Sequence, residues 1–339
     1  MKFVHTADTH LGYDITKTVQ AHPQGRKKRA DCIFQNFSMV VEHAIREEVD
    51  FFIHSGDLFN KYYIPGEILD ALIRPIVALA EAGIPVLLIP GNHERSQFPF
   101  DLFHGSGPIY VFDQPRSICL EIDGYSLGVA GFPFIREGSG KLFFKALEET
   151  EYEGMRTDLN ILVTHQAFDG AVVGPVDFHF RAGRRDTVSR EQVPRDFAYI
   201  AAGHIHRYQI LSHPLDPGLK FVYPGSTQRM SFAEMHEEKG FIEGELINGR
   251  IETRFIPLPA WEMEIVELMA AGLSSEECEE AIKQQFWRFS GDLVIRFNLK
   301  GGERLGDYPD VDFKKIREHM PPILECQFAL RTGARWTQR

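Results

Sequence analysis

Apolar residues in the first third of the chain occur in short runs separated by longer segments with helical periodicity. The runs at 3–6, 51–54 and 85–89 are short and rich in β-branched and aromatic residues, which predicts buried strands. Between them, residues 31–48 and 65–82 have the apolar spacing of helices that pack one face against a core. The order strand, helix, strand, helix, strand predicts an α/β core.

Residues 118 to 256 are richer in strand patterns than the first part of the chain. Two pairs of apolar runs flank the turn dipeptides Asp123-Gly124 and Asn248-Gly249, which predicts two hairpins. The strands expected in this part are 118–122, 125–130, 159–164, 199–202, 221–223, 241–247 and 251–256.

A second, smaller pattern begins after Pro257-Leu258-Pro259, which has the composition of a linker. A strand-helix-strand-helix-strand order over about 80 residues predicts a small separate α/β domain. We therefore place a domain boundary between a domain of residues 1–258 and a domain of residues 259–339. The expected elements of the second domain are strands at 263–268, 292–298 and 323–328 and helices at 275–288 and 310–318.

Side chains that commonly bind metals follow five of the predicted strands. They are Asp8, His10, Asp57, Asn92, His165, His204 and His206. Because binding sites of α/β sheets lie outside the carboxyl ends of the strands, we expect these side chains to form one site. Carboxylate and amide oxygens together with imidazole nitrogens suit manganese, iron or zinc better than calcium or magnesium alone. The two-residue spacing of Asp8/His10 and of His204/His206 would place each pair on one side of an extended backbone, which suggests one pair for each metal.

Five motifs that contain these residues occur in a characteristic order. They are Asp8-x-His10, Gly56-Asp57, Gly91-Asn92-His93-Glu94, His165 and Gly203-His204-x-His206. Each motif is weak alone, but together and in this order they are specific, and residues 1–256 resemble the calcineurin-like metallophosphoesterases. The resemblance implies a four-layer α/β/β/α sandwich followed by a small C-terminal α/β capping domain.

The resemblance also implies a division of the ligands between two divalent metals. Asp57 would bridge them; Asp8, His10 and His206 would complete the first site, and Asn92, His165 and His204 the second. Two such metals clamp a phosphate and activate a water for attack on phosphorus. His93 resembles the family histidine that stabilises the transition state or protonates the leaving group; the alternative is a structural role beside Asn92. Manganese is the expected metal, with iron, zinc or magnesium as alternatives.

Other segments narrow the resemblance within the family. Gly56-Asp57-Leu58-Phe59-Asn60 lacks the Gly-Asp-x-Val-Asp-Arg-Gly signature of the protein phosphatases, so that branch is disfavoured. The chain resembles SbcD-type DNA-repair exonuclease subunits. The segments that carry this resemblance are His5–Gly12, Arg29-x-Asp31, Gly56–Phe59, Tyr223–Arg229, Phe232-x-Glu234 and Lys239-Gly240-Phe241. This resemblance implies a manganese-dependent DNA exo- or endonuclease in double-strand-break repair or recombination, with a capping domain that helps to bind DNA.

The same resemblance implies partners and substrate contacts. DNA would be the substrate, Asn60 and Arg229 would contact it, an SbcC-type ATPase would be a partner, and a homodimer is an open alternative to a monomer. Many family members have histidine where this chain has Asn60, and asparagine can donate a hydrogen bond but cannot carry a proton. Relatives bind the ATPase through a helical segment beyond the cap. We expect that this segment lies outside the sequence that ends at Arg339, or that the protein works without the partner.

Composition keeps two other functions open. The formal net charge of -11 argues against coating of nucleic acid by bulk positive charge. A phosphodiesterase or phosphatase for a nucleotide or another small molecule is therefore the alternative enzyme, and a metal-stabilised scaffold without activity is a third hypothesis. Basic patches that could still contact phosphate are Arg26-Lys27-Lys28-Arg29 and the cluster of Arg181, Arg184, Arg185, Arg190 and Arg195.

Cysteine usage and hydropathy indicate the compartment. The four cysteines, Cys32, Cys119, Cys278 and Cys326, form no C-x-x-C pair, so we expect buried free thiols rather than a zinc site or disulfides. The N-terminal sequence has no apolar signal-peptide region, and no apolar run is long enough to span a bilayer. We therefore expect a cytoplasmic protein without a membrane segment.

Overall fold

The computed structural model describes residues 1–13, 29–61, 64, 66–94, 100–103, 107–122, 124–136, 139–289, 291–318, 323–332 and 335–338. These residues belong to two compact units: Met1–Thr18 with Ala30–Ala260, and Val19–Arg29 with Trp261–Arg339. The basic residues 26–28 and the turn residue Asp123 lie outside the described residues.

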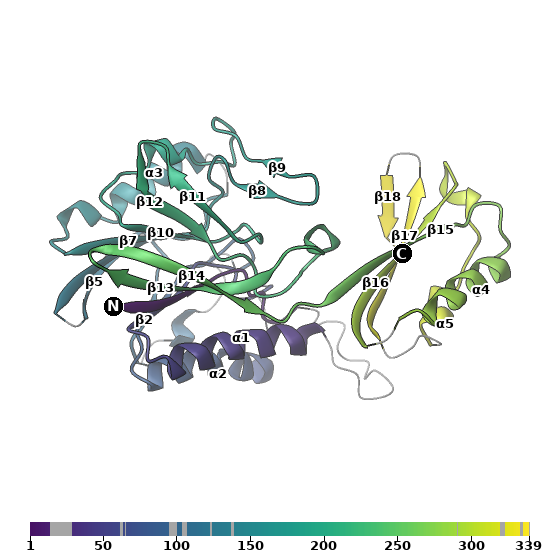
Figure 1. Cartoon of the computed structure of the whole chain (residues 1–339), viewed down its shortest axis with the longest axis horizontal. Coiled ribbons are helices and arrows are strands. Elements are labelled where there is room, and N and C mark those ends of the chain that lie inside the picture. Colours follow the sequence, from purple (N-terminus) through teal and green to yellow (C-terminus); the bar gives the residue numbers. More distant parts are fainter. Residues whose placement is uncertain are drawn as a thin grey trace. The chain divides into compact units, whose positions relative to one another are not determined.

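Two six-stranded sheets form the centre of the first unit, as far as its described residues extend (Figure 1). The first sheet has the order β14-β13-β1-β2-β3-β4, in which β1 to β4 are parallel and β13 and β14 are antiparallel. Its strands are β1 (Lys2–Thr6), β2 (Phe51–His54), β3 (Val86–Leu88), β4 (Ile109–Val111), β13 (Lys239–Ile247) and β14 (Arg250–Leu258).

The second sheet has the order β11-β12-β10-β7-β6-β5, with β12, β10, β7 and β6 parallel and the two edge strands antiparallel. Its strands are β5 (Arg116–Ile122), β6 (Tyr125–Gly131), β7 (Leu159–Thr164), β10 (Tyr199–Ala202), β11 (Gln209–His213) and β12 (Asp216–Tyr223). The hairpin expected around Gly124 is confirmed by the pairing of β5 with β6, and the one at Asn248-Gly249 by the pairing of β13 with β14.

Alternate side chains of both sheets meet in a core between them. Phe3 of β1 stacks on Phe51 of β2 at 4.9 Å between ring centroids and meets the edge of Tyr199, from the second sheet, at 5.3 Å. Such aromatic pairs add about 0.5–1.5 kcal/mol each beyond the area they bury. The neighbouring residues Val4 and Phe52 point to the opposite face of the first sheet, as the two-residue period of strands requires.

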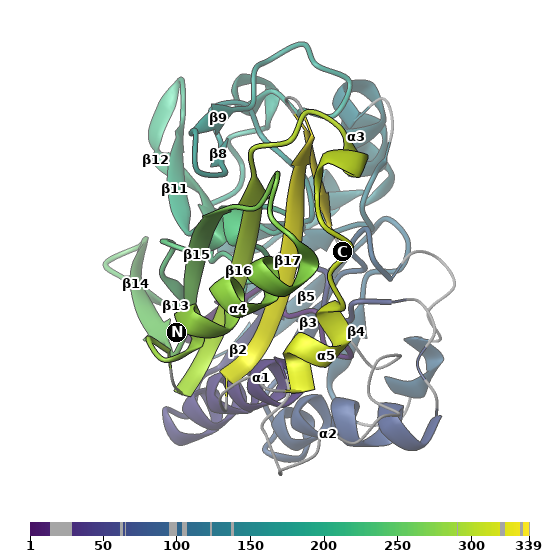
Figure 2. The same ribbon diagram turned by 90° about the vertical axis from the view of Figure 1, so that its right-hand side faces the viewer.

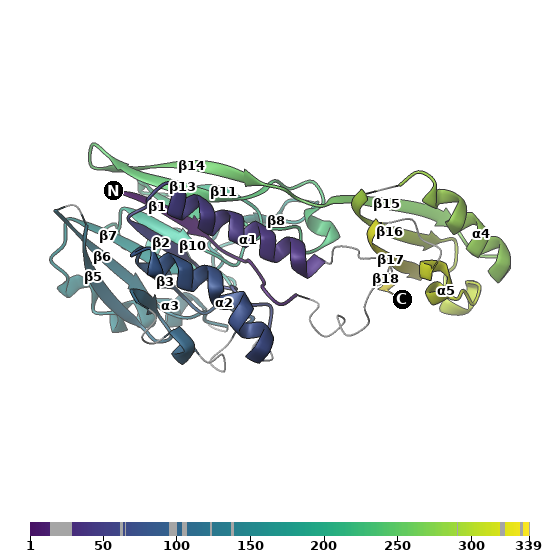
Figure 3. The same cartoon turned by 90° about the horizontal axis from the view of Figure 1, so that it is seen from below.

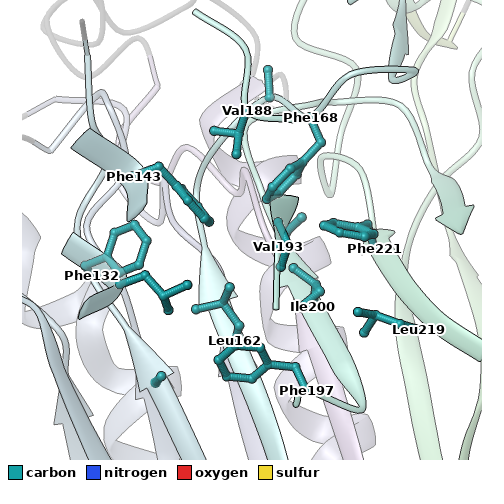
Figure 4. Close-up of a cluster of buried hydrophobic side chains, with 14 of the residues drawn as sticks. Phe132, Phe143, Leu162, Phe168, Val188, Val193, Phe197, Ile200, Leu219 and Phe221 are labelled. Atoms are coloured by element: carbon teal, nitrogen blue, oxygen red, sulfur yellow. The ribbon is translucent and has the colours of Figure 1, made fainter. Parts of the chain in front are cut away.

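Helices cover the outer faces of both sheets. α1 (Arg29–Arg46) and α2 (Gly66–Glu81) cover the first sheet (Figure 3). The ring centroid of Phe37 in α1 lies 6.5 Å from that of Phe52 in β2. α3 (Ser139–Glu149) and the segment after β7 cover the second sheet in a core rich in aromatic side chains (Figure 4), and Phe143 meets the edge of Phe132 at 5.1 Å. The predicted layer order α/β/β/α is confirmed.

The second unit is a smaller α/β fold. Its parallel strands β15 (Glu262–Met269), β16 (Gly291–Lys300) and β17 (Ile323–Thr332) are joined through α4 (Ser275–Phe286) and α5 (Phe313–Glu318), which share one face of the sheet (Figure 2). The antiparallel strand β18 (Arg335–Gln338) extends the sheet at β17.

The second unit contains a helix cap at α4 and two contacts of Arg29. Ser274 and Glu277 form a reciprocal capping box that fixes the start of α4. Arg29, from the predicted Arg29-x-Asp31 motif, lies over the ring of Trp261 at 4.4 Å and forms a 3.0 Å ion pair with Glu325. A capping or DNA-binding role for this unit stays a prediction.

Several expectations from the sequence need correction. Pro257 and Leu258 are the last residues of β14, since Leu258 pairs with Lys239, so the expected linker is part of a strand. Cys119 is exposed rather than buried, because it lies on edge strand β5 beside the inward-facing Leu120, and Cys32 is only partly buried. The strands β4, β11 and β18 were not expected, nor were the two short strands β8 (Val172–Val173) and β9 (Phe178–His179). No helix among the described residues is both long and apolar enough to cross a membrane.

The pairing of Gly244 with Phe3 provides a test of the core. A Cβ on Gly244 would collide with the Phe3 ring, which cannot move because Phe51 and Tyr199 hold it. We expect Gly244→Ala to lower the free energy of unfolding by about 1–3 kcal/mol, measured by urea denaturation.

Gly140 in α3 is the matched control, because a Cβ there meets no atom within 4 Å. Gly140→Ala should leave the protein as stable as before or raise its stability by about 0.5–1 kcal/mol. An unchanged urea midpoint for Gly244→Ala would contradict this account of the core.

Candidate metal centre

The predicted ligands lie where parallel strands of both sheets end. Strands β1, β2 and β3 lead into the loops with Asp8, Asp57 and Asn92, and β7 and β10 lead into those with His165 and His204. Sites of α/β proteins gather at such carboxyl ends because the loops there converge.

Backbone hydrogen bonds join these loops. The amide of Asp8 donates to the carbonyl of Gly56 at 3.0 Å, and the amide of His10 donates to the carbonyl of Asp57 at 3.0 Å. Across the two sheets, the amide of His204 donates to the Asp8 carboxylate at 3.1 Å. The loops therefore support one another and place their side chains together.

Four of the predicted ligands have a left-handed backbone. The φ angles are 50° at Asp8, 54° at His10, 54° at Asp57 and 84° at His204. Such conformations cost non-glycine residues on the order of 1–3 kcal/mol each and concentrate at functional sites. The backbone at Asp8-x-His10 and His204-x-His206 is therefore not extended, and the inference that each pair shares one side was based on the wrong geometry.

Glycines before the ligands allow the loops to approach closely. A Cβ on Gly91 would collide with the Asp57 carboxylate, and a Cβ on Gly203 would collide with the carbonyl of Ser55 and the ring of His165. Glycine is therefore needed before Asn92 and His204, because a side chain at either position would not fit.

Asp8, His10 and His206 form the first cluster. The Nε2 atoms of His10 and His206 lie 3.1 Å apart, and His206 Nε2 lies 3.9 Å from Asp8 Oδ1. His10 Nε2 also lies 3.9 Å from Asp57 Oδ2. These ligand atoms are close enough to contact one ion.

Asn92, His165 and His204 form the second cluster. Asn92 Oδ1 lies 3.1 Å from His165 Nε2 and 2.8 Å from His204 Nδ1. His165 Nε2 lies 3.4 Å from the same Asp57 Oδ2 atom that faces His10. Asp57 therefore lies between the clusters, and His204 and His206 belong to different ones. Spacing alone suggested that this pair shares a metal, whereas the two side chains lie in different clusters.

Burial and mutual charge shift the pKa values of the group. Burial raises the pKa of Asp8 to about 6, although His165 and His206 oppose the shift. Burial also acts to raise the pKa of Asp57, but the charge and hydrogen bond of His165 outweigh it, so that pKa lies below its usual range. Burial alone would lower the pKa of His165, yet Asp57 and Asp8 raise it to about 9. Burial lowers the pKa of His204 to about 3.

The donor set fits divalent metal ions. Asp8 is fully buried and Asp57 is 2% exposed, and carboxylates at such depth need positive charge close by. The surrounding donors are imidazole nitrogens and an amide oxygen, a mixture typical of manganese, iron or zinc sites. The clustered carboxylates and imidazoles are compatible with the two divalent metals of calcineurin-like phosphoesterases. The assignment of each residue to a metal stays a prediction.

Of the other predicted site residues, His93 lies beside Asp57. His93 is exposed, its Nδ1 lies 3.1 Å from the carbonyl oxygen of Asn60, and its Nε2 lies 3.9 Å from Asp57 Oδ2. Asn60 thus contributes its main chain to the orientation of His93. Arg229 donates through Nε to the carbonyl of Glu237 at 3.1 Å. Substrate contacts by Asn60 and Arg229 stay predictions.

Glu94 is a site residue whose role the sequence did not reveal. Its buried carboxylate accepts hydrogen bonds from the amides of Phe59 at 2.9 Å and Gly91 at 2.6 Å, which joins the loops of Asp57 and Asn92. Burial, with Asp57 nearby, raises the Glu94 pKa to about 8. The motif Gly91-Asn92-His93-Glu94 was the available signal, but it does not tell a ligand from a support.

Comparisons with known proteins agree with this geometry. Residues 1–208 match the family model of the calcineurin-like phosphoesterases. The chain is 29% identical over 258 residues to the DNA double-strand break repair protein Mre11 of Methanococcus maripaludis. This match covers 73% of this chain and 63% of that protein. It is 30% identical over 249 residues to Mre11 of Aeropyrum pernix, covering 69% and 55%.

A third relative is the SbcD component of the nuclease SbcCD from Staphylococcus epidermidis, at 26% identity over 311 residues, which covers 85% of this chain and 78% of that protein. The chain thus spans less than two thirds of the length of the two Mre11 relatives. The predicted resemblance is confirmed, and since the matching model covers more than half of the 339 residues, the chain belongs to the calcineurin-like phosphoesterase family.

Proposed function

We propose that this protein is a metal-dependent phosphodiesterase that cleaves DNA during double-strand-break repair or recombination. The observation that carries the proposal is the convergence of six side chains of metal-binding types, from both sheets, around a seventh, Asp57. The names of the relatives, which are double-strand-break repair proteins and a nuclease subunit, support DNA as the substrate.

The buried carboxylates and imidazoles would hold two divalent ions, for which manganese is our choice. When bound, such ions supply the positive charge that polarises a phosphoryl group and activates water at neutral pH. Asp8, His10 and His206 would hold one ion, Asn92, His165 and His204 the other, and Asp57 would contact both. The left-handed ligand loops and their hydrogen bonds keep these donors in place before substrate arrives.

His93 is suited to act on the substrate itself. With its Nδ1 donating to the carbonyl of Asn60, its Nε2 faces Asp57 Oδ2 at 3.9 Å. A histidine in this position can stabilise charge on the phosphoryl oxygens or give a proton to the leaving oxygen. Its exposure distinguishes it from the buried His10 and His165 and from the partly buried His204 and His206.

Exposed arginines that follow a hairpin bonded to Arg207 support a polyanionic substrate. Arg207, the residue after His206, forms a 2.6 Å ion pair with Asp177 and donates to the carbonyl of Gly174 at 2.8 Å. These bonds fix the hairpin of β8 (Val172–Val173) and β9 (Phe178–His179), and the segment that follows exposes Arg181, Arg184 and Arg185. Arginines on such a segment can contact the phosphates of a nucleic acid despite the net charge of -11.

The second candidate is a phosphodiesterase or phosphatase for a nucleotide or another small molecule. The net charge of -11 favours it, because a small substrate needs no extended basic surface. We further propose a cytoplasmic protein that works with an SbcC-type ATPase, as the name of the SbcCD relative suggests; self-association as a homodimer is part of the same proposal.

A substrate panel separates these functions. With Mn²⁺, we expect the protein to cleave single- or double-stranded DNA, to lose activity in excess EDTA, and to fall to background activity when Asp57→Ala removes the shared carboxylate. Asp50→Ala is the control, because Asp50 lies before β2 and Asp57 after it. Rapid hydrolysis of bis-p-nitrophenyl phosphate with no cleavage of any DNA would contradict the nuclease. No turnover of any phosphoester despite bound metal would favour the non-catalytic scaffold.

The role of His93 has a separate test. His93→Ala should reduce the turnover number on DNA about 10²–10⁴-fold, as for loss of a general acid or base, while two Mn²⁺ ions per chain still bind. His43→Ala, in α1 and bonded to Glu243, should change neither quantity. Loss of bound Mn²⁺ in His93→Ala would instead identify His93 as a ligand, and unchanged turnover would show that it is not needed.

A further inference from the structure

A buried carboxylate lies directly behind His206. Glu234 Oε1 is 3.2 Å from His206 Nδ1, while the opposite ring nitrogen, Nε2, faces His10 and Asp8 at 3.1 Å and 3.9 Å. A donor on Nδ1 leaves the lone pair of Nε2 directed at the cluster. We infer that Glu234 is a positioning residue, which fixes the tautomer and orientation of His206 and thereby sets the affinity of the first metal site. This inference rests on the proposed metal-dependent function.

Glu234 is itself held by four further donors. Its Oε2 accepts from Lys239 Nζ at 2.7 Å, from Ser226 Oγ at 3.2 Å and from the amide of Met230 at 3.3 Å, and its Oε1 accepts from Ser231 Oγ at 3.1 Å. Its side chain is 9% exposed. A buried carboxylate with this many partners has little freedom to move, so it can hold the ring of His206 in one orientation.

Lys239 extends this support to the main chain of His206. Its Nζ is fully buried and donates to the carbonyl oxygen of His206 at 2.9 Å as well as to Glu234. The amide of Ser226 donates to the same carbonyl at 3.1 Å. Side chain and backbone of His206 are thus fixed by one network, and Lys239 has a second carboxylate partner in Glu237 at 3.2 Å.

In the described part of the chain, the other three histidines of the two clusters lack an equivalent carboxylate behind the ring. His165 Nδ1 lies 2.8 Å from the backbone carbonyl of Ser55, and the Nδ1 of His204 faces Asn92 within the second cluster. The Nδ1 of His10 is buried with no hydrogen-bond partner in the described part of the chain. An acidic partner raises the basicity of a ligating histidine, so the support of Glu234 acts on the first site and not on the second.

The network gives a role to three segments that the sequence singled out without one. Ser226 follows Pro224-Gly225, Glu234 is the acid of Phe232-x-Glu234, and Lys239 begins Lys239-Gly240-Phe241. Each supplies one member of the group behind His206. Their spacing in the sequence hides this, because the 3₁₀ turn Phe232–Glu234 and the start of β13 bring them together.

Metal binding tests the inference without measuring activity. MnCl₂ is titrated into the chelator-treated full-length chain and followed by calorimetry, and we expect two bound ions for the unchanged protein. Glu234→Gln removes the charge behind His206 and should weaken one of the two sites about 10–100-fold while the other keeps its affinity.

Glu237→Gln is the matched control. It removes the other carboxylate partner of Lys239, and Glu237 has no hydrogen bond to the ring of His206, so both affinities should stay unchanged. If Glu234→Gln does not fold, Glu234→Asp is the variant that tests the inference. It keeps a negative charge for Lys239, but its shorter side chain cannot reach His206 as closely. Selective weakening of one site in that variant supports the inference.

The outcomes are distinct. Two sites of unchanged affinity in Glu234→Gln, or in Glu234→Asp where that variant decides, would overturn the role of Glu234. Equal weakening of both sites, or the same loss in Glu237→Gln, would overturn it as well, because it would reveal general damage to the fold. An unchanged protein that binds no pair of ions would overturn the proposed metal centre itself.

Discussion

Two carboxylates, Asp8 and Asp57, are buried where the ends of two sheets meet, and much of the structure serves to keep them there. Burial of a charge is costly unless opposite charge lies close, and here the neighbours are imidazoles whose nitrogens converge on the same space. The rise in the pKa of His165 to about 9 is a measure of that need for positive charge. Divalent ions would satisfy it while leaving the imidazoles neutral.

This constraint explains local features that are unfavourable by themselves. Left-handed conformations at Asp8, His10, Asp57 and His204 are costly, but they turn the ligands inward, and hydrogen bonds between loops stabilise them. Buried supports behind the ligands, such as Glu94 and the Glu234–Lys239 pair, fix the loops in turn. The aromatic core between the sheets gives these loops a rigid base.

The fold and the convergence of the candidate ligands could be predicted because both depend on local patterns. Strands of buried residues have a recognisable composition, and each ligand follows one of them, so the order of motifs was informative. The division of His204 and His206 between clusters could not be read from spacing, because it depends on a φ of 84° at His204. Glu234 and Lys239 could not be assigned, since hydrogen bonds between distant segments define their role. Cys119 was wrongly predicted to be buried, because composition does not show that its strand lies at the edge of the sheet.

Anomalous X-ray diffraction at the manganese edge, from crystals grown with Mn²⁺, tests the two-metal centre most directly. The account predicts two peaks that share Asp57, one bounded by Asp8, His10 and His206 and the other by Asn92, His165 and His204. A single peak, or peaks bound by other residues, would contradict it.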